Sequence, residues 1–219
     1  MAFIDPSSPN LTDFTTFVYA NGISTAQLPF GSLSTVSIDT SGNLTASSLT
    51  GTVTAGMILV GTGLSDNTLL STFNPTTLAG TVSPAPSSPV SDPTVSAWSA
   101  YLAWAFDQAK GVSPDPPPCL APIIWVLATY NLGMHTLIRI AQDVSGQTFF
   151  QDLRTSFKIG SFVAGVLTNA NDENTGAQLL VPEAFKKLSL GNIDLLKTPY
   201  GREYLMYIQQ YGPTIVGVS

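Results

Sequence analysis

The sequence predicts an α+β protein, with a mainly helical bundle as its body, an inserted small β domain and an extended C-terminal tail. Apolar residues recur at helical spacing within residues 1–32 and again within residues 93–219. Between these parts, residues 33–83 are rich in Ser, Thr, Val and Leu and are punctuated by glycines, which is typical of short strands and turns. These observations together predict the fold class.

The first part, residues 1–32, is expected to be an opening helix with a lead-in to the helical body. The helix is predicted over residues 9–22, where Asn21-Gly22 supplies a left-handed stop. Its buried face would consist of Leu11, Phe14, Phe17 and Val18. We therefore expect this helix to dock on a larger body.

The small β-rich module is predicted over residues 33–83, with turns at Ser41-Gly42-Asn43 and at Asn74-Pro75. Residues 84–92 are rich in proline and serine, which indicates a semi-rigid linker. The sequence thus predicts a domain boundary at this linker.

Residues 93–219 are predicted to form a helical assembly domain. Asp92 is placed to cap a helix that begins at Pro93 and ends at Gly111. A longer helix is predicted over residues 119–142, where apolar side chains recur every three or four positions. Each large side chain buried between these two helices would contribute about 1.5–3 kcal/mol. The pair is therefore expected to form the centre of the core.

The remaining predicted elements are shorter and follow in chain order. They are a helix over residues 147–158, a strand over 162–167, a polar loop over 169–176, a helix over 182–188, a turn over 192–196 and a last helix that opens at Thr198-Pro199 and ends at Gly212-Pro213.

The extended C-terminal tail is apolar and β-prone, and it follows the predicted end of the last helix. Such a segment suits addition to the edge of a sheet on a neighbouring chain. We therefore predict that partners are bound by Thr214, Ile215, Val216, Gly217, Val218 and Ser219.

Charge is divided unevenly along the chain. The first 109 residues contain six aspartates and no Lys, Arg or His, whereas residues 110–219 contain eight acids and eight bases. The net charge of −6 offers little attraction for nucleic acid or for an anionic membrane. Such sparse charge instead predicts a protein that works inside an assembly. A single cysteine and an N-terminus without basic and apolar blocks predict synthesis in a cytoplasm.

A search for reactive groups finds isolated residues. His135, the single histidine, is interpreted as a hydrogen-bonded structural residue of a helix rather than as a general base. Cys119 is interpreted as a small buried residue. Residues 171–176 lack the ligand spacing of a calcium loop, and no helix follows Gly61-Thr62-Gly63-Leu64 to complete a dinucleotide site. We therefore expect no enzymatic activity, no cofactor and no metal ion.

Three segments resemble virion proteins of tailed bacteriophages. Residues 51–70, GTVTAGMILVGTGLSDNTLL, resemble a small Gly-rich β module that recurs in these proteins. Residues 130–135, YNLGMH, and residues 197–205, KTPYGREYL, resemble the helical body of phage neck proteins. The resemblance covers about half of the chain.

The resemblance implies a structural virion protein, a head-to-tail connector or adaptor in the neck. Its copies would form a dodecameric ring beneath the portal protein, in contact with tail or collar proteins, and DNA would pass through the ring at ejection without specific binding. Two alternatives stay open. One is a collar, tail or capsid-decoration protein whose β module binds a partner or receptor, and the other is a virion-associated hydrolase with a hidden active site.

Overall fold

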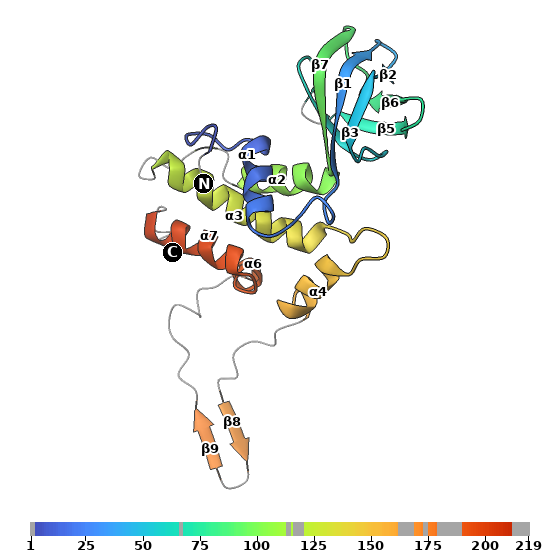
Figure 1. The fold of residues 1–219 in the computed structure, drawn as a ribbon. Helices are drawn as coiled ribbons and strands as arrows, with labels where there is room; N and C mark the ends of the chain where they lie inside the picture. The colour runs from blue at the N-terminus through green and yellow to red at the C-terminus, as the bar shows by residue number, and fades with distance from the viewer. Residues whose placement is uncertain are drawn as a thin grey trace.

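The computed structural model describes residues 3–65, 68–112, 115, 121–161, 169–172, 175–178 and 190–211. In these residues the chain forms a helical body with a closed antiparallel β barrel on one side and a two-stranded hairpin on the other (Figure 1). The predicted fold class, a mainly helical bundle with a small β domain, is therefore wrong. The β part is larger than predicted, and it forms a closed barrel around a hydrophobic core of its own.

The barrel is built from strands that pair only in antiparallel fashion among the described residues. In chain order they are β1 (Phe30–Ile38), β2 (Asn43–Thr45), β3 (Ser48–Gly51), β4 (Ile58–Val60), β5 (Leu69–Asn74), β6 (Ala79–Ser83) and β7 (Val90–Trp98). Their order is β2-β6-β5-β4-β7-β1, and the pairing of β2 with β1 closes the barrel. β2 and β3 both pair with β1 along the same edge, and the pairing of β3 continues the register of β2. Turns follow β1 and β5 at the two predicted places.

Two neighbouring strands, β1 and β7, change the face that they bury at the same level of the barrel. In β1, the buried positions change from odd to even numbers at Thr35, whose φ is 48°. In β7, the opposite change occurs at Pro93, which faces Thr35 in the register. The ladder between the two strands is interrupted there, so the strand tolerates a proline that has no backbone N–H to donate.

The change of buried face in β7 breaks the alternation by which a strand is recognised, so the sequence predicts a helix where this strand lies. The predicted helix start at Pro93 is wrong, and the last three residues of the predicted linker belong to β7. Val95 and Trp98 are three residues apart and lead into the apolar spacing of the helix that follows β7, so together they imitate one helical face. Asp92 caps no helix, because its carboxylate accepts hydrogen bonds from the backbone N–H groups of Thr62 and Thr94.

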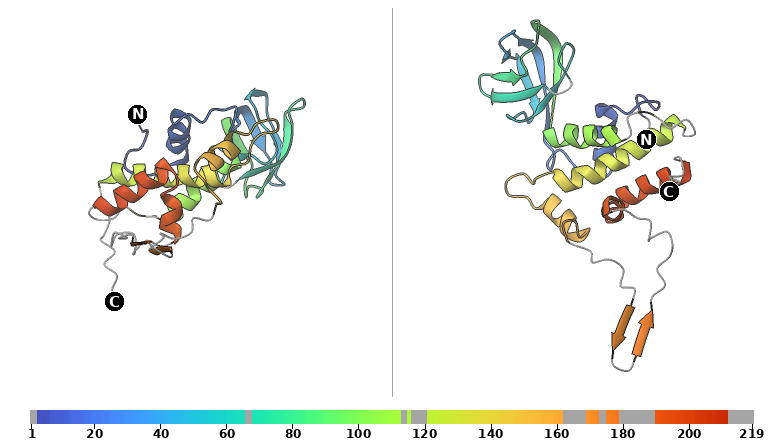
Figure 2. Two further views of the ribbon diagram at one scale, coloured as in Figure 1. Left: turned by 90° about the horizontal axis from the view of Figure 1, so that it is seen from below. Right: turned by 180° about the vertical axis from the view of Figure 1, so that it is seen from behind.

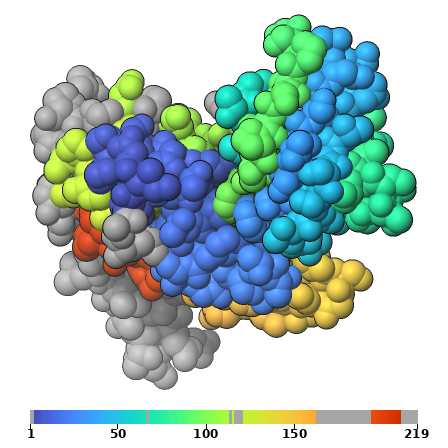
Figure 3. Space-filling model, turned by 45° about the horizontal axis from the view of Figure 1, so that its top comes forward, coloured from blue at the N-terminus to red at the C-terminus, as the bar shows by residue number. Residues whose placement is uncertain are grey.

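The barrel joins the helical body through its first and last strands. Phe30 starts β1 opposite Trp98 at the end of β7, and their ring centroids lie 4.4 Å apart. At the same end, Ile58 packs against Ala100 and Ala103 of the following helix. The barrel is thus an insertion that leaves and re-enters the body at one place, and Figure 3 shows it as a lobe beside the helices.

The helical body is arranged around one long helix. It contains α1 (Leu11–Ala20), α2 (Ala100–Val112), α3 (Pro122–Ile140), α4 (Phe149–Ser156), α6 (Leu190–Leu195) and α7 (Pro199–Tyr211). α3 contacts α1, α2, α4 and α7. Its Tyr130 is fully buried beside the rings of Phe14 and Phe17. Gly133 is required at this contact, since a Cβ atom there would lie 2.7 Å from the Phe14 ring.

The length and composition of α3 would allow it to cross a membrane, but 72% of its apolar window is buried inside the fold. This burial is that of a core helix, as the sequence predicts for the long helix. The helices predicted over residues 9–22, 119–142 and 147–158 are confirmed as α1, α3 and α4, and the predicted last helix is confirmed as α7.

The second β element is a hairpin of β8 (Asn169–Asp172) and β9 (Thr175–Gln178), which replaces most of the predicted polar loop. It lies away from the helices in Figure 1 and in the right panel of Figure 2. The strand predicted over residues 162–167 and the helix predicted over residues 182–188 lie outside the described residues.

Candidate functional site

A groove of about 880 Å³ lies in the helical body beneath α3. Its lining comes from α2, α3, the segment after α4, α6 and the start of α7, so it joins parts that are far apart in the sequence. The residues that line it are Gln108, Val112, Leu132, His135, Thr136, Arg139, Ile159, Gly160, Ser161, Asp194, Leu195, Lys197 and Tyr204. A volume of this size can accept a ligand or a segment of another chain.

One face of α3 forms the wall of this groove. His135 and Thr136 follow Leu132 by three and four residues and precede Arg139 by four and three, so the four side chains leave the helix on the same side. His135 and Arg139 lie one helical turn apart. The imidazole is buried, with 1% of the His135 side chain exposed, whereas 51% of the Arg139 side chain is exposed.

His135 is a neutral, hydrogen-bonded residue. Its Nδ1 atom lies 2.7 Å from the Thr198 Oγ1 atom, and its Nε2 atom lies 3.5 Å from an Asp194 carboxylate oxygen. Burial lowers the pKa of His135 to about 4 against the opposing effect of Asp194. The proton of the neutral ring belongs on Nε2, which faces the carboxylate, so the Thr198 hydroxyl donates to Nδ1.

Asp194 is the centre of the charged network. Its carboxylate receives Arg139 Nε at 3.3 Å and Lys197 Nζ at 3.2 Å, in addition to the nearby His135 ring. Lys197 also donates to the backbone carbonyl of Ser161 at 3.2 Å. This hydrogen bond ties Ser161, at the end of the segment after α4, to the segment between α6 and α7.

Thr198, His135 and Asp194 contact one another in series and have the residue types of a catalytic triad. A substrate cannot reach the hydroxyl group of this series. Thr198 is fully buried, and its Oγ1 atom accepts a hydrogen bond from the Gly201 backbone N–H at the start of α7. A nucleophile must reach its substrate, and a helix cap with no exposed surface cannot do so. The three residues therefore act here as a buried connection between α3, α6 and α7, in agreement with the structural role predicted for His135.

The other sequence candidates do not join this groove. Gly61-Thr62-Gly63-Leu64 forms the turn after β4, where the Thr62 N–H donates to Asp92, so it binds its own barrel. Of residues 171–176, Asn171 and Asp172 belong to β8 and Thr175 and Gly176 to β9, and no cluster of three metal-ligating side chains occurs in the described part of the chain. Cys119 and the tail, Thr214 to Ser219, lie outside the described residues.

His135 is recognisable from the sequence as a candidate residue, whereas Asp194, Lys197 and the groove itself are not. The spacing of His135 and Arg139 was a usable signal, because two polar residues four positions apart in an apolar helix share one face. No local pattern could place Asp194 and Thr198 beside them, since Thr198 is 63 residues away from His135.

Comparison with known proteins gives no match: no protein family, no curated protein and no solved structure is significantly similar to this chain.

Proposed function

We propose that the chain is a structural virion protein of a tailed bacteriophage, a head-to-tail connector whose copies form a ring in the neck. The observation that carries the proposal is the surface of the helical body, where large apolar side chains are exposed. Few charged side chains surround them, because only 10% of the chain is charged. Trp104 is 48% exposed and Val112 is 65% exposed, two turns apart on α2. A surface of this kind is suited to contact with other chains rather than to a free monomer.

The segments that resemble phage proteins lie at positions that support this proposal. Residues 51–70 run from the end of β3 through β4 to β5, so they form one side of the closed barrel. The two helical segments meet in the core, because His135 of the first is hydrogen-bonded to Thr198 of the second. The three segments therefore belong to the framework of the fold rather than to its periphery.

In this proposal the helical bodies form the ring wall, through which DNA passes without specific binding. The portal protein lies on one side and tail or collar proteins lie on the other. Residues 214–219 bind a neighbouring chain, as their sequence predicts.

The proposal is tested with the purified chain and with particles that carry it. Light scattering coupled to size-exclusion chromatography and negative-stain microscopy should show a closed ring, alone or on addition of the portal protein. A chain that stays monomeric in both conditions and is missing from purified particles contradicts the proposal. Deleting residues 214–219 should leave a folded chain that no longer joins its partners, and normal particle assembly by that variant would contradict the role of the tail.

A second candidate function is a collar, tail or decoration protein whose barrel binds a receptor or capsid. The barrel favours it, because the strands and turns from Phe30 to Trp98 contain Ser and Thr in abundance and only three ionisable acids or bases, Asp39, Asp66 and Asp92. A barrel-deleted chain separates the two candidates. Particles that assemble but fail to attach to cells support the second, and particles that fail to join heads to tails support the first.

A further inference from the structure

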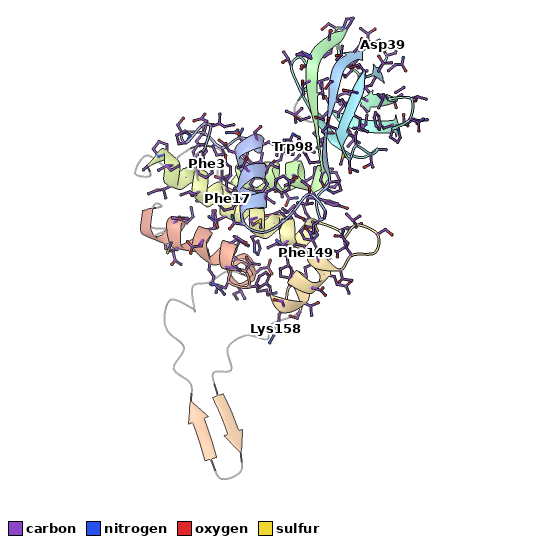
Figure 4. The ribbon with its side chains drawn as sticks, in the orientation of Figure 1. Phe3, Phe17, Asp39, Trp98, Phe149 and Lys158 are labelled. Atoms are coloured by element: carbon purple, nitrogen blue, oxygen red, sulfur yellow. The ribbon has the colours of Figure 1, made fainter. Side chains whose placement is uncertain are left out.

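The bases of the chain are separated from the barrel in space as well as in sequence, whereas acids occur in both parts. α1, the barrel and most of α2 come from the first 109 residues, which hold six aspartates and no base. All eight bases follow, in the rest of the chain. Figure 4 shows the result: Asp39 lies at the end of the barrel far from the helices, and Lys158 lies at the opposite edge of the helical body.

The groove beneath α3 has cationic side chains in its lining and at its edge. Of its charged lining residues in the described part of the chain, Arg139 and Lys197 are cationic and Asp194 is anionic, which leaves one positive charge in excess. Lys158 is exposed directly beside the lining residue Ile159. Among the described residues, Arg139 contacts Asp194 through Nε, so its half-exposed guanidinium keeps donors for a further carboxylate.

Asp39 presents a carboxylate that is fixed in position. Its oxygens accept hydrogen bonds from the backbone N–H groups of Ser41 and Asn43 and from the Asn43 side chain, at 2.7–2.9 Å. The Asn43 side chain and backbone lower the pKa of Asp39, so this carboxylate is ionised at neutral pH. A charge that is already ordered loses little conformational entropy when it binds.

We propose that the groove beneath α3 is the docking site for the barrel of a second copy of this chain, with Asp39 of that copy facing Arg139 and Lys158. This inference rests on the proposed ring and names the faces that form it. The two faces are different and lie at opposite ends of one chain, and repeated contacts of this kind generate a ring when the rotation closes. The barrel complements the cationic groups of the groove in charge, because its strands and turns contain acids and no base.

The groove also argues against a nucleic-acid occupant. A phosphate backbone would meet the Asp194 carboxylate inside the groove, and the whole chain carries a net charge of −6. A protein surface with a single carboxylate can be bound by one or two cations, and Arg139 and Lys158 supply that number at the edge of the groove. The partner is therefore a protein surface of low charge density.

The test measures self-association of the full chain by sedimentation velocity at 50 and 500 mM salt. Arg139→Gln, Lys158→Gln and Asp39→Asn each remove one charge, and Lys110→Gln removes an exposed cation outside the groove as a matched control. Asn at position 39 retains the Oδ1 atom that accepts hydrogen bonds from the Ser41 and Asn43 backbone N–H groups and loses only the acceptor of the Asn43 side chain. Circular dichroism and melting confirm that each variant is folded, and Lys158→Gln keeps the test valid if Arg139→Gln disturbs Asp194.

We expect each groove or barrel variant to weaken association about tenfold at low salt and less at high salt. The double variant R139Q/D39N should associate no more weakly than D39N alone, because D39N already removes the partner of Arg139, and K110Q should match the native chain. Unchanged association of D39N, or of both R139Q and K158Q, overturns the inference while leaving the ring in place. Weakening by deletion of residues 212–219 but not by D39N also overturns it, because the tail is then the occupant. A native chain that does not associate at all contradicts the ring itself.

Discussion

Protonation of His135 links the stability of the helical body to pH. The folded protein holds the imidazole between α3, α6 and α7, and burial lowers its pKa from 6.5 to about 4. The unfolded chain therefore binds a proton more readily than the folded chain does. The resulting stabilisation is complete above pH 6.5 and is lost as the pH falls toward 4.

The size of this loss follows from the two pKa values. A shift of one unit corresponds to about 1.36 kcal/mol. With a pKa near 6.5 in the unfolded chain and about 4 in the folded chain, unfolding free energy should fall by about 2 kcal/mol between pH 7 and pH 5, and by about 3 kcal/mol by pH 4. His135→Gln removes the titrating group, so this part of the pH dependence should disappear in the variant.

Two measurements check the prediction. Because His135 is the single histidine, its ring proton signal in an NMR titration reports the folded-state pKa directly. Urea unfolding at pH 7, 6 and 5 gives the free energies of the native chain and of H135Q, and the carboxylates that do not contact His135 contribute equally to both. An NMR pKa near 6.5, or parallel pH profiles for the two proteins, would refute the reasoning.

Three further predictions follow from the fold. Replacing residues 30–98 with a short Gly-Ser bridge should preserve the helical circular dichroism and a cooperative melt, because the ends of the barrel are neighbours; loss of the helical signal would show that the barrel is no insertion. Asp92→Ala should lower barrel stability in urea by about 2–4 kcal/mol, since two backbone donors lose their acceptor, and an unchanged midpoint would contradict that role. Purified assemblies should show no appreciable affinity for duplex DNA at moderate salt, whereas binding with a steep salt dependence would restore a DNA-gripping role.

The sequence predicts the helices well because their signals are local. Asn21-Gly22 and Thr198-Pro199 mark helix ends directly, and the apolar spacing of α3 is regular. Strand β7 could not be recognised, because its alternation breaks at Pro93 and is repaired only by the matching break at Thr35 in a strand far away in sequence. Barrel closure and the groove depend on such pairings between distant segments, which no single window of sequence contains.

The most direct test of the proposed function is cryo-electron microscopy of intact phage particles that carry this chain. The account predicts a ring between portal and tail in which each copy shows a closed six-strand barrel inserted in a helical body. A chain found outside the neck, or absent from the particle, would contradict it.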